Sequence, residues 1–250
     1  MATPAILLFT DFSHAGPYVG QVKAVLAAHA PEVPVIDLMH DAPTWDPMAA
    51  AYLLAALAPE CRKGSVLLCV VDPGVGTDER KPTVVRADGR WFVGPGNGLF
   101  NVVAARAKTL SWWDITWSPD RLSPTFHGRD LFAPVAAGLA LDREPPGTAC
   151  VPAARLLPDW PDNYPRIIYV DHFGNAMTGI RGTSLDPSRS IEINGYEFSY
   201  ARTFAAAPPA RGFWYANSNG LVEIAINQGR ATDRYELKPG DEVLLGEDDE

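Results

Sequence analysis

The first part of the chain alternates short apolar runs with segments of helical periodicity. Apolar positions recur at helical spacing after Pro17, and Asp46-Pro47 is a start signal for an Ala/Leu-rich helix. The intervening apolar runs are typical of strands buried on both faces of a sheet and comprise residues 5–9, 33–38 and 65–71. This order predicts an α/β unit with a mainly parallel sheet and helices on both faces.

Turn signals place the next elements. Ala87-Asp88-Gly89-Arg90 predicts a tight turn between strands at 83–86 and 91–93. Further helices are expected after Gly98 and after Asp130, where apolar residues again repeat at helical spacing.

Composition then changes. Six prolines fall between residues 144 and 165, which predicts a stiff, extended connection. Beyond it, short strand-like segments are separated by Asn194-Gly195, Asn219-Gly220 and Pro239-Gly240. We therefore expect an α/β domain over residues 1–144, a proline-rich linker over 145–165 and a smaller antiparallel, barrel-like β domain over 166–250.

Charge limits the possible partners. The chain has 21 basic and 30 acidic residues, a formal charge of −9, and its last four residues are all acidic. This balance argues against nucleic acid and against an anionic membrane surface as partners.

The N-terminal apolar run is too short for a membrane span or a secretory leader, and the three cysteines form no CxxC pair. A location in a reducing cytoplasm is expected.

Two polar loops could carry chemistry. Asp11 and Asp72 follow buried strands, at the sheet edge where α/β proteins place their sites. In the glycine-rich loop that follows Asp72, Arg80 could pair with this carboxylate, or the loop could be an ordinary turn with a surface ion pair. His127 stands at a predicted helix start, where the alternative is capping by Asp130 with His127 exposed.

Other chemistries find little support in the sequence. The five histidines lack metal-ligand spacing, so no metal site is expected. Gly94-Pro-Gly-Asn-Gly98 is neither a phosphate-binding Walker loop nor a dinucleotide motif, and no Gly-x-Ser-x-Gly nucleophile elbow occurs.

The order of the loop motifs along the whole chain is more specific than any one of them. It comprises Thr10-Asp-Phe12, Tyr18-Val-Gly20, Val71-Asp-Pro-Gly-Val-Gly76, Asn97-Gly-Leu99, His127-Gly-Arg-Asp130, Asp171-His-Phe-Gly-Asn175 and Asn217-Ser-Asn-Gly220. Together these motifs resemble the S-adenosylmethionine (SAM) hydroxide adenosyltransferases, which form adenosine and are related to the bacterial fluorinase and chlorinase.

The resemblance implies a homotrimer that hydrolyses SAM without a cofactor. Each site would combine the N-terminal domain of one subunit with the C-terminal β-barrel domain of the next. The family's hydrolytic triad falls on Asp72, Arg80 and His127. Halogenating relatives carry a tyrosine at the position of Asp72 and an extra loop at Asp88-Gly89, so both differences favour water as the nucleophile.

Substrate-binding positions are also implied. Trp45 and Phe204 resemble walls around the nucleoside, Phe173 and Asn175 resemble adenine contacts, and Asp171 and Ser218 resemble contacts to the methionine ammonium and carboxylate. Asp11, the aspartate of the family's first motif, is also present in this chain and is expected to bind substrate.

Two departures from the family pattern stand out. The carboxylate that binds the ribose in relatives is replaced by Gly16, which leaves three interpretations: weaker affinity, substitution by His14, or a different adenosyl substrate. Ile226 stands where halogenating relatives carry arginine. Gly16 keeps open another adenosyl- or nucleoside-directed hydrolase or transferase. A catalytically weak SAM or adenosine sensor is a separate alternative.

Overall fold

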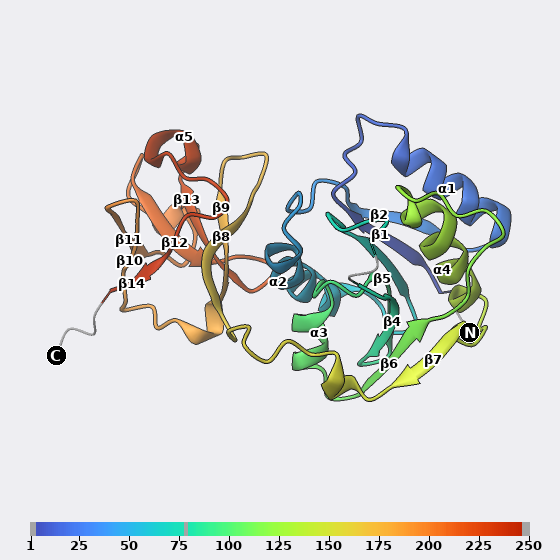
Figure 1. The fold of residues 1–250 in the computed structure, drawn as a ribbon. Helices are drawn as coiled ribbons and strands as arrows, with labels where there is room; N and C mark the ends of the chain where they lie inside the picture. The colour runs from blue at the N-terminus through green and yellow to red at the C-terminus, as the bar shows by residue number, and fades with distance from the viewer. Residues whose placement is uncertain (1–3, 78–79, 247–250) are drawn as a thin grey trace. The chain divides into compact units, whose positions relative to one another are not determined.

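The computed structural model describes residues 4–77 and 80–246. The chain divides into two compact units, Met1–Pro158 and Asp159–Glu250 (Figure 1). None of the helices in the described residues is long and apolar enough to cross a membrane.

The N-terminal unit is built on one seven-stranded sheet. Its strands, in spatial order, are β2 (Val35–Met39), β1 (Ile6–Thr10), β3 (Val66–Val70), β5 (Arg90–Pro95), β4 (Pro82–Ala87), β6 (Leu110–Ile115) and β7 (Gly147–Cys150). The strands predicted at 5–9, 33–38 and 65–71 correspond to β1, β2 and β3. The strands β6 and β7 were not anticipated, and β7 lies in the proline-rich segment.

The sheet is mixed, so the prediction of a mainly parallel sheet holds only for its first half. β1 pairs in parallel with β2 and β3, and β3 pairs in parallel with β5. The pairs β4–β5, β4–β6 and β6–β7 are antiparallel. The change of direction begins at the turn between β4 and β5, where Asp88 and Gly89 have φ of 47° and 81°. A two-residue turn can join only antiparallel strands.

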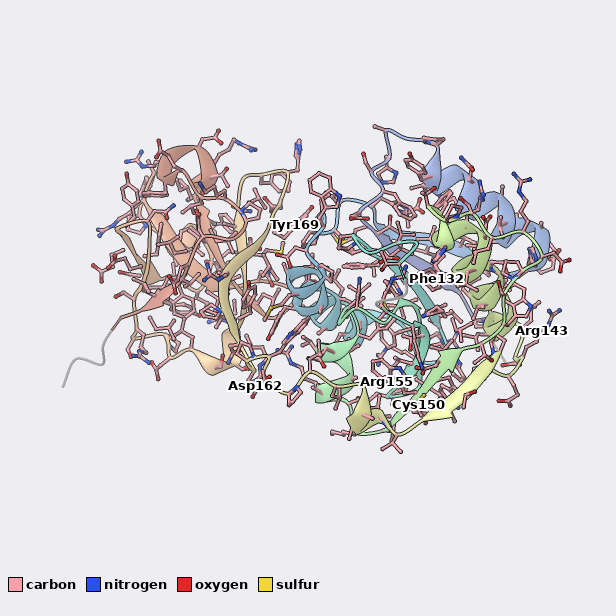
Figure 2. The ribbon with its side chains drawn as sticks, viewed as in Figure 1. Phe132, Arg143, Cys150, Arg155, Asp162 and Tyr169 are labelled. Atoms are coloured by element: carbon pink, nitrogen blue, oxygen red, sulfur yellow. The ribbon has the colours of Figure 1, made fainter. Side chains whose placement is uncertain are left out.

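Helices cover both faces of this sheet. They are α1 (Tyr18–His29), α2 (Pro47–Leu57), α3 (Asn101–Arg106) and α4 (Ala133–Ala140). α1 packs with α4 on one side of the sheet, and α2 packs with α3 on the other (Figure 1). Asp46 begins α2 as predicted, because its Oδ1 accepts a hydrogen bond from the N–H of Ala49 at 2.9 Å. Phe132 is fully buried in the core between the sheet and α4 (Figure 2).

Short turns complete the N-terminal unit. A π-helical turn, η2 (Gly128–Phe132), leads directly into α4, while 3₁₀ turns occur at η1 (Ala58–Glu60) and η3 (Pro152–Ala154). After η3, Arg155 donates its Nε–H to Asp114 Oδ1 at 3.0 Å and so ties the end of this unit to β6 (Figure 2).

The C-terminal unit is a second seven-stranded sheet that is mostly antiparallel. Its spatial order is β14 (Leu244–Leu245), β10 (Ile191–Ile193), β11 (Tyr196–Tyr200), β12 (Gly212–Ala216), β13 (Leu221–Ile226), β9 (Ala176–Arg181) and β8 (Tyr164–Val170). Only the β11–β12 pair is parallel among these described strands. The unit also contains α5 (Ala231–Tyr235), η4 (Gly182–Ser184) and η5 (Phe204–Ala206).

The edges of this second sheet nearly meet. The N–H of Ile167 on β8 donates to the carbonyl of Asp241 at 2.9 Å, and the N–H of Val243 donates to the carbonyl of Pro165 at 2.9 Å. These bonds join β8 to the segment that enters β14, so the sheet curls into a nearly closed barrel. A closed sheet leaves few unpaired backbone groups at its edges.

Candidate active site

Strand register brings two predicted site loops together in the N-terminal unit. β1 and β3 are adjacent and parallel, and Thr10 is paired with Val70 at their carboxyl ends. The N–H of Asp11 donates to the carbonyl of Val70 at 3.3 Å. Asp11 and Asp72 therefore emerge at the same edge of the sheet, as their positions after two buried strands had indicated.

Asp72 and Arg80 form a buried ion pair. The Nε–H of Arg80 donates to Asp72 Oδ1 at 2.7 Å, and Nη2 donates to Oδ2. The side chains are only 4% and 6% exposed, which rules out the alternative of a surface ion pair. Two parallel hydrogen bonds fix the guanidinium in one orientation.

His127 completes this cluster. Its Nδ1 lies 3.5 Å from Nη2 of Arg80. Burial, reinforced by the positive charge of Arg80, lowers the pKa of His127, while Asp72 and Asp130 oppose the shift. The imidazole is therefore neutral at neutral pH and has one ring nitrogen able to accept a proton. His127 is half-buried rather than exposed.

The capping alternative for Asp130 is also not realised. Its carboxylate accepts the Nε–H of Arg129 at 2.6 Å and the N–H of Ser123 at 2.8 Å. Both partners lie outside the first turn of α4, so Asp130 holds the loop in front of His127 instead of capping the helix.

A cavity of about 310 Å³ opens beside this cluster. Its described lining residues are Asp11, Phe12, Trp45, Val70, Asp72, Pro73, Val75, Thr125, Phe126, His127 and Gly128. Burial raises the pKa of Asp11, and the backbone N–H of Trp45 opposes this by donating to its Oδ2 at 3.4 Å. The indole of Trp45 is 78% exposed, so it is free to cover a ligand.

Gly16 and His14, at the first departure from the family pattern, lie outside the described lining of this cavity. The ring of His14 instead packs edge-on against His40, with centroids 4.7 Å apart. A role for His14 in place of the missing carboxylate stays a prediction.

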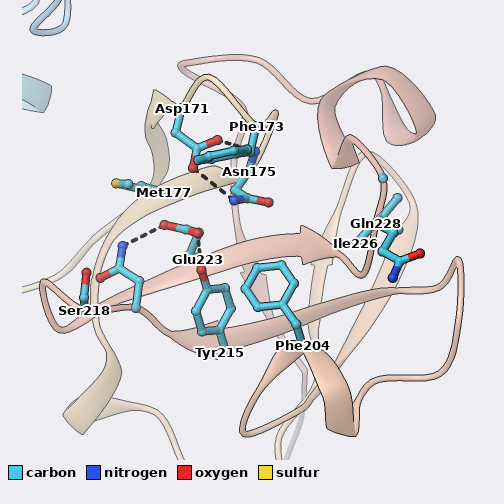
Figure 3. A pocket seen from close by; sticks show the side chains of 12 residues that line it. Asp171, Phe173, Asn175, Met177, Phe204, Tyr215, Ser218, Glu223, Ile226 and Gln228 are labelled. Atoms are coloured by element: carbon cyan, nitrogen blue, oxygen red, sulfur yellow. Dashed lines mark hydrogen bonds between the residues drawn. The ribbon is translucent and has the colours of Figure 1, made fainter.

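A larger pocket of about 680 Å³ lies in the C-terminal unit (Figure 3). All five residues predicted for substrate binding in this unit line it, namely Asp171, Phe173, Asn175, Phe204 and Ser218. They come from three separate loops, which the barrel brings together.

The loop after β8 is held in shape by its own side chains. Asp171 accepts the backbone N–H of Asn175 at 2.8 Å and its amide N–H at 3.0 Å. Gly174 between them has a φ of +77°, a conformation that favours glycine. The turn leaves Phe173 70% exposed beside the pocket, so this ring is available to stack on a planar ligand.

The pocket also contains a residue that the sequence did not single out. Glu223 on β13 is 2% exposed and is paired across the strands with Tyr215 on β12. Its carboxylate accepts hydrogen bonds from the Tyr215 hydroxyl and from the Asn217 amide. The available signal was a single acidic residue within the otherwise apolar segment 221–226, all of whose residues are buried in the structure.

Comparison with protein families identifies the two domains of the chain. The model of the SAM hydroxide adenosyltransferase N-terminal domain matches residues 6–148, and that of the C-terminal domain matches residues 165–244. The chain belongs to the SAM hydroxide adenosyltransferase family.

Individual relatives agree with this assignment. An (R)-S-adenosyl-L-methionine hydrolase from Thermus thermophilus is 39% identical, over 96% of this chain and 98% of its own length. A protein of the same name from Salinispora arenicola is 36% identical over 98% of each chain. An uncharacterized conserved protein from Thermotoga maritima has a similar structure, with a TM-score of 0.85 and 29% identity over 97% of this chain and 100% of its own. Two domains of this family account for nearly the whole chain.

Proposed function

We propose that this protein hydrolyses SAM at the ribose 5′ carbon and releases adenosine and L-methionine. The observation that carries the proposal is the buried Asp72–Arg80 ion pair beside the half-buried His127, with Asp72 and His127 both lining one cavity. Relatives named SAM hydrolases that match over nearly the full chain support the same reaction.

The reaction makes a particular demand on the protein. Water forms a bond to C5′ while the C5′–S bond breaks, and the electron pair leaves with a neutral thioether that needs no proton. The difficulty lies in the nucleophile, because forming free hydroxide at neutral pH from water of pKa ~15.7 costs about 12 kcal/mol. The site must therefore take the proton from water and stabilise the developing negative charge.

The triad residues match these tasks. Arg80 stays protonated, so it serves as the fixed positive charge for the developing hydroxide. Neutral His127 accepts the proton from water. Asp72 orients Arg80 through its two hydrogen bonds and offsets part of its charge. No metal or other cofactor is required by this scheme.

The remaining predicted residues divide the substrate between the two units. We assign Asp11 and Trp45 to the nucleoside on the N-terminal side. On the C-terminal side, Phe173 and Asn175 contact the adenine, Phe204 forms a wall, and Asp171 and Ser218 hold the methionine ammonium and carboxylate. The lining of the two cavities supports this division.

We further propose that the protein works as a homotrimer in the cytoplasm. Each site combines the N-terminal unit of one subunit with the C-terminal unit of a neighbour. Mixing tests this directly: H127A and D171A subunits, each inactive alone, should regain part of the activity after joint refolding. No recovery in a mixture shown by mass spectrometry to contain mixed trimers contradicts a shared site.

Incubation with SAM in ¹⁸O-labelled water tests the reaction itself. Attack at C5′ places the label in the 5′ hydroxyl of adenosine, together with unlabelled methionine. Release of free adenine would indicate cleavage of the glycosidic bond and hence a different nucleoside-directed hydrolase. Binding of SAM with no product would indicate a sensor.

A further inference from the structure

Glu223 is a buried carboxylate inside a ligand-sized pocket. It is 2% exposed, and both of its oxygens accept hydrogen bonds, from the Tyr215 hydroxyl and from Asn217 Nδ2, the latter at 2.7 Å (Figure 3). Two donors on the two oxygens suit the ionised form. Burial nevertheless raises the pKa of Glu223, because the charged form loses its hydration.

Glu223 has no ion-pair partner within the described part of the chain. The ion pairs found there, on residues 4–77 and 80–246, do not include it. The neighbouring charge that affects it is Asp171, which has the same sign and also lines the pocket. Two carboxylates in one cavity without a cation form an unfavourable arrangement unless a ligand brings the opposite charge.

The walls of the pocket favour a cation as well. Phe204 and Tyr215 pack at a centroid distance of 5.3 Å, and both rings line the pocket together with the exposed Phe173. Aromatic faces attract cations through their quadrupole. At the position where halogenating relatives carry arginine, Ile226 contributes no compensating positive charge.

We infer that Glu223 determines specificity by making this pocket prefer ligands that carry a positive group. The inference rests on the proposed function, because SAM supplies two such groups, its sulfonium and its ammonium. Glu223 reinforces Asp171 on the amino-acid side of the substrate and also holds Asn217, whose loop presents Ser218. The preference for charge is the part that a purely structural role would not produce.

Three adenosine compounds that differ in their positive groups at neutral pH test this preference. SAM has both cationic groups, S-adenosylhomocysteine has only the ammonium, and methylthioadenosine has neither. We expect E223Q to raise the Kd for SAM at least tenfold. Its Kd for methylthioadenosine, measured by calorimetry, should change less than twofold. A loss for S-adenosylhomocysteine equal to that for SAM identifies the ammonium as the partner, and a loss for SAM alone identifies the sulfonium. Equal losses for all three compounds, or no loss, overturn the inference.

Control variants keep the test interpretable. E192Q removes the same charge from an exposed position on β10 and should leave all three affinities unchanged. E223D keeps the charge and should preserve the ratio of the SAM and methylthioadenosine affinities even where folding is weakened. If the wild-type protein forms no adenosine but E223Q still weakens only the cationic ligands, the proposed function fails while this inference stands.

Discussion

Arg80 holds Asp72 through two parallel hydrogen bonds in a site where neither side chain is more than 6% exposed. A paired charge at this depth is tolerated because each ion replaces the hydration of the other. The same pairing aims the guanidinium at His127 Nδ1, 3.5 Å away. Stability and chemistry therefore depend on one contact.

Replacement of Asp72 by Asn should expose that dependence. The variant leaves the Arg80 charge buried without its partner, so we expect the free energy of unfolding to fall by about 3–5 kcal/mol. SAM turnover should also fall, because the guanidinium loses its orientation. Urea denaturation provides the measurement. D233N removes the acid from the exposed Arg230–Asp233 pair and should change stability by less than about 1 kcal/mol. Equal effects of the two variants would refute the buried-pair interpretation.

Turnover should depend on the protonation of His127. H127A should lower kcat by about 10²–10⁴ if the imidazole accepts the proton from water. H29A, at an exposed histidine at the end of α1, is the matched control and should retain full activity. If H127A had the kcat of the wild-type protein, His127 would have no part in the mechanism.

The pH dependence follows from the lowered pKa of His127. The base is neutral above that pKa, so kcat should hold through neutral pH and decline only below the ordinary histidine range near ~6.5. Because the folded pKa lies below the unfolded one, the His127 contribution to stability is fully present above the unfolded value. It is lost as the pH falls through the folded pKa. A kcat–pH profile with its acidic limb above the ordinary histidine pKa would contradict the shift.

Two phenylalanines of the C-terminal unit should behave in opposite ways. Phe173 is 70% exposed, so F173A should leave the melting temperature unchanged but raise the KM for SAM by about tenfold or more through lost stacking. Phe198 is fully buried, and F198A should cost about 3–5 kcal/mol of stability. Thermal denaturation and steady-state kinetics test both. A stability loss in F173A without a change in KM would argue against a ligand-facing ring.

The turn at Gly174 offers a test of loop shape. A Cβ there would lie 2.8 Å from Thr232 Oγ1 and 2.9 Å from Arg230 Cβ, in addition to the strain at φ +77°. G174A should therefore lower stability by more than the roughly 1 kcal/mol expected from strain alone, and it should raise the KM for SAM. G195A has a similar φ of +78° and meets nothing within 4 Å, so it isolates the strain. Equal losses in the two variants would show that the close contacts do not matter.

Local signals in the sequence were sufficient for many elements. Continuous apolar runs give β1 and β3, Asp46-Pro47 begins α2, and Asp88-Gly89 makes the turn between β4 and β5. For β9 the sequence carries no comparable signal, because Gly179 interrupts its pattern and because it joins the sheet through long-range pairing with β8 and β13.

What the sequence determined by itself was the set of polar residues at strand ends, such as Asp11 and Asp72, and the motif order that identifies the family. Residue type and spacing are local properties, and a chain carries them before it folds. Only the tertiary structure decided that Arg80 is buried against Asp72 and that Glu223 faces a cavity opposite Tyr215. Burial and cross-strand register arise from pairing between segments distant in sequence, and these set the charge and hydration of each side chain.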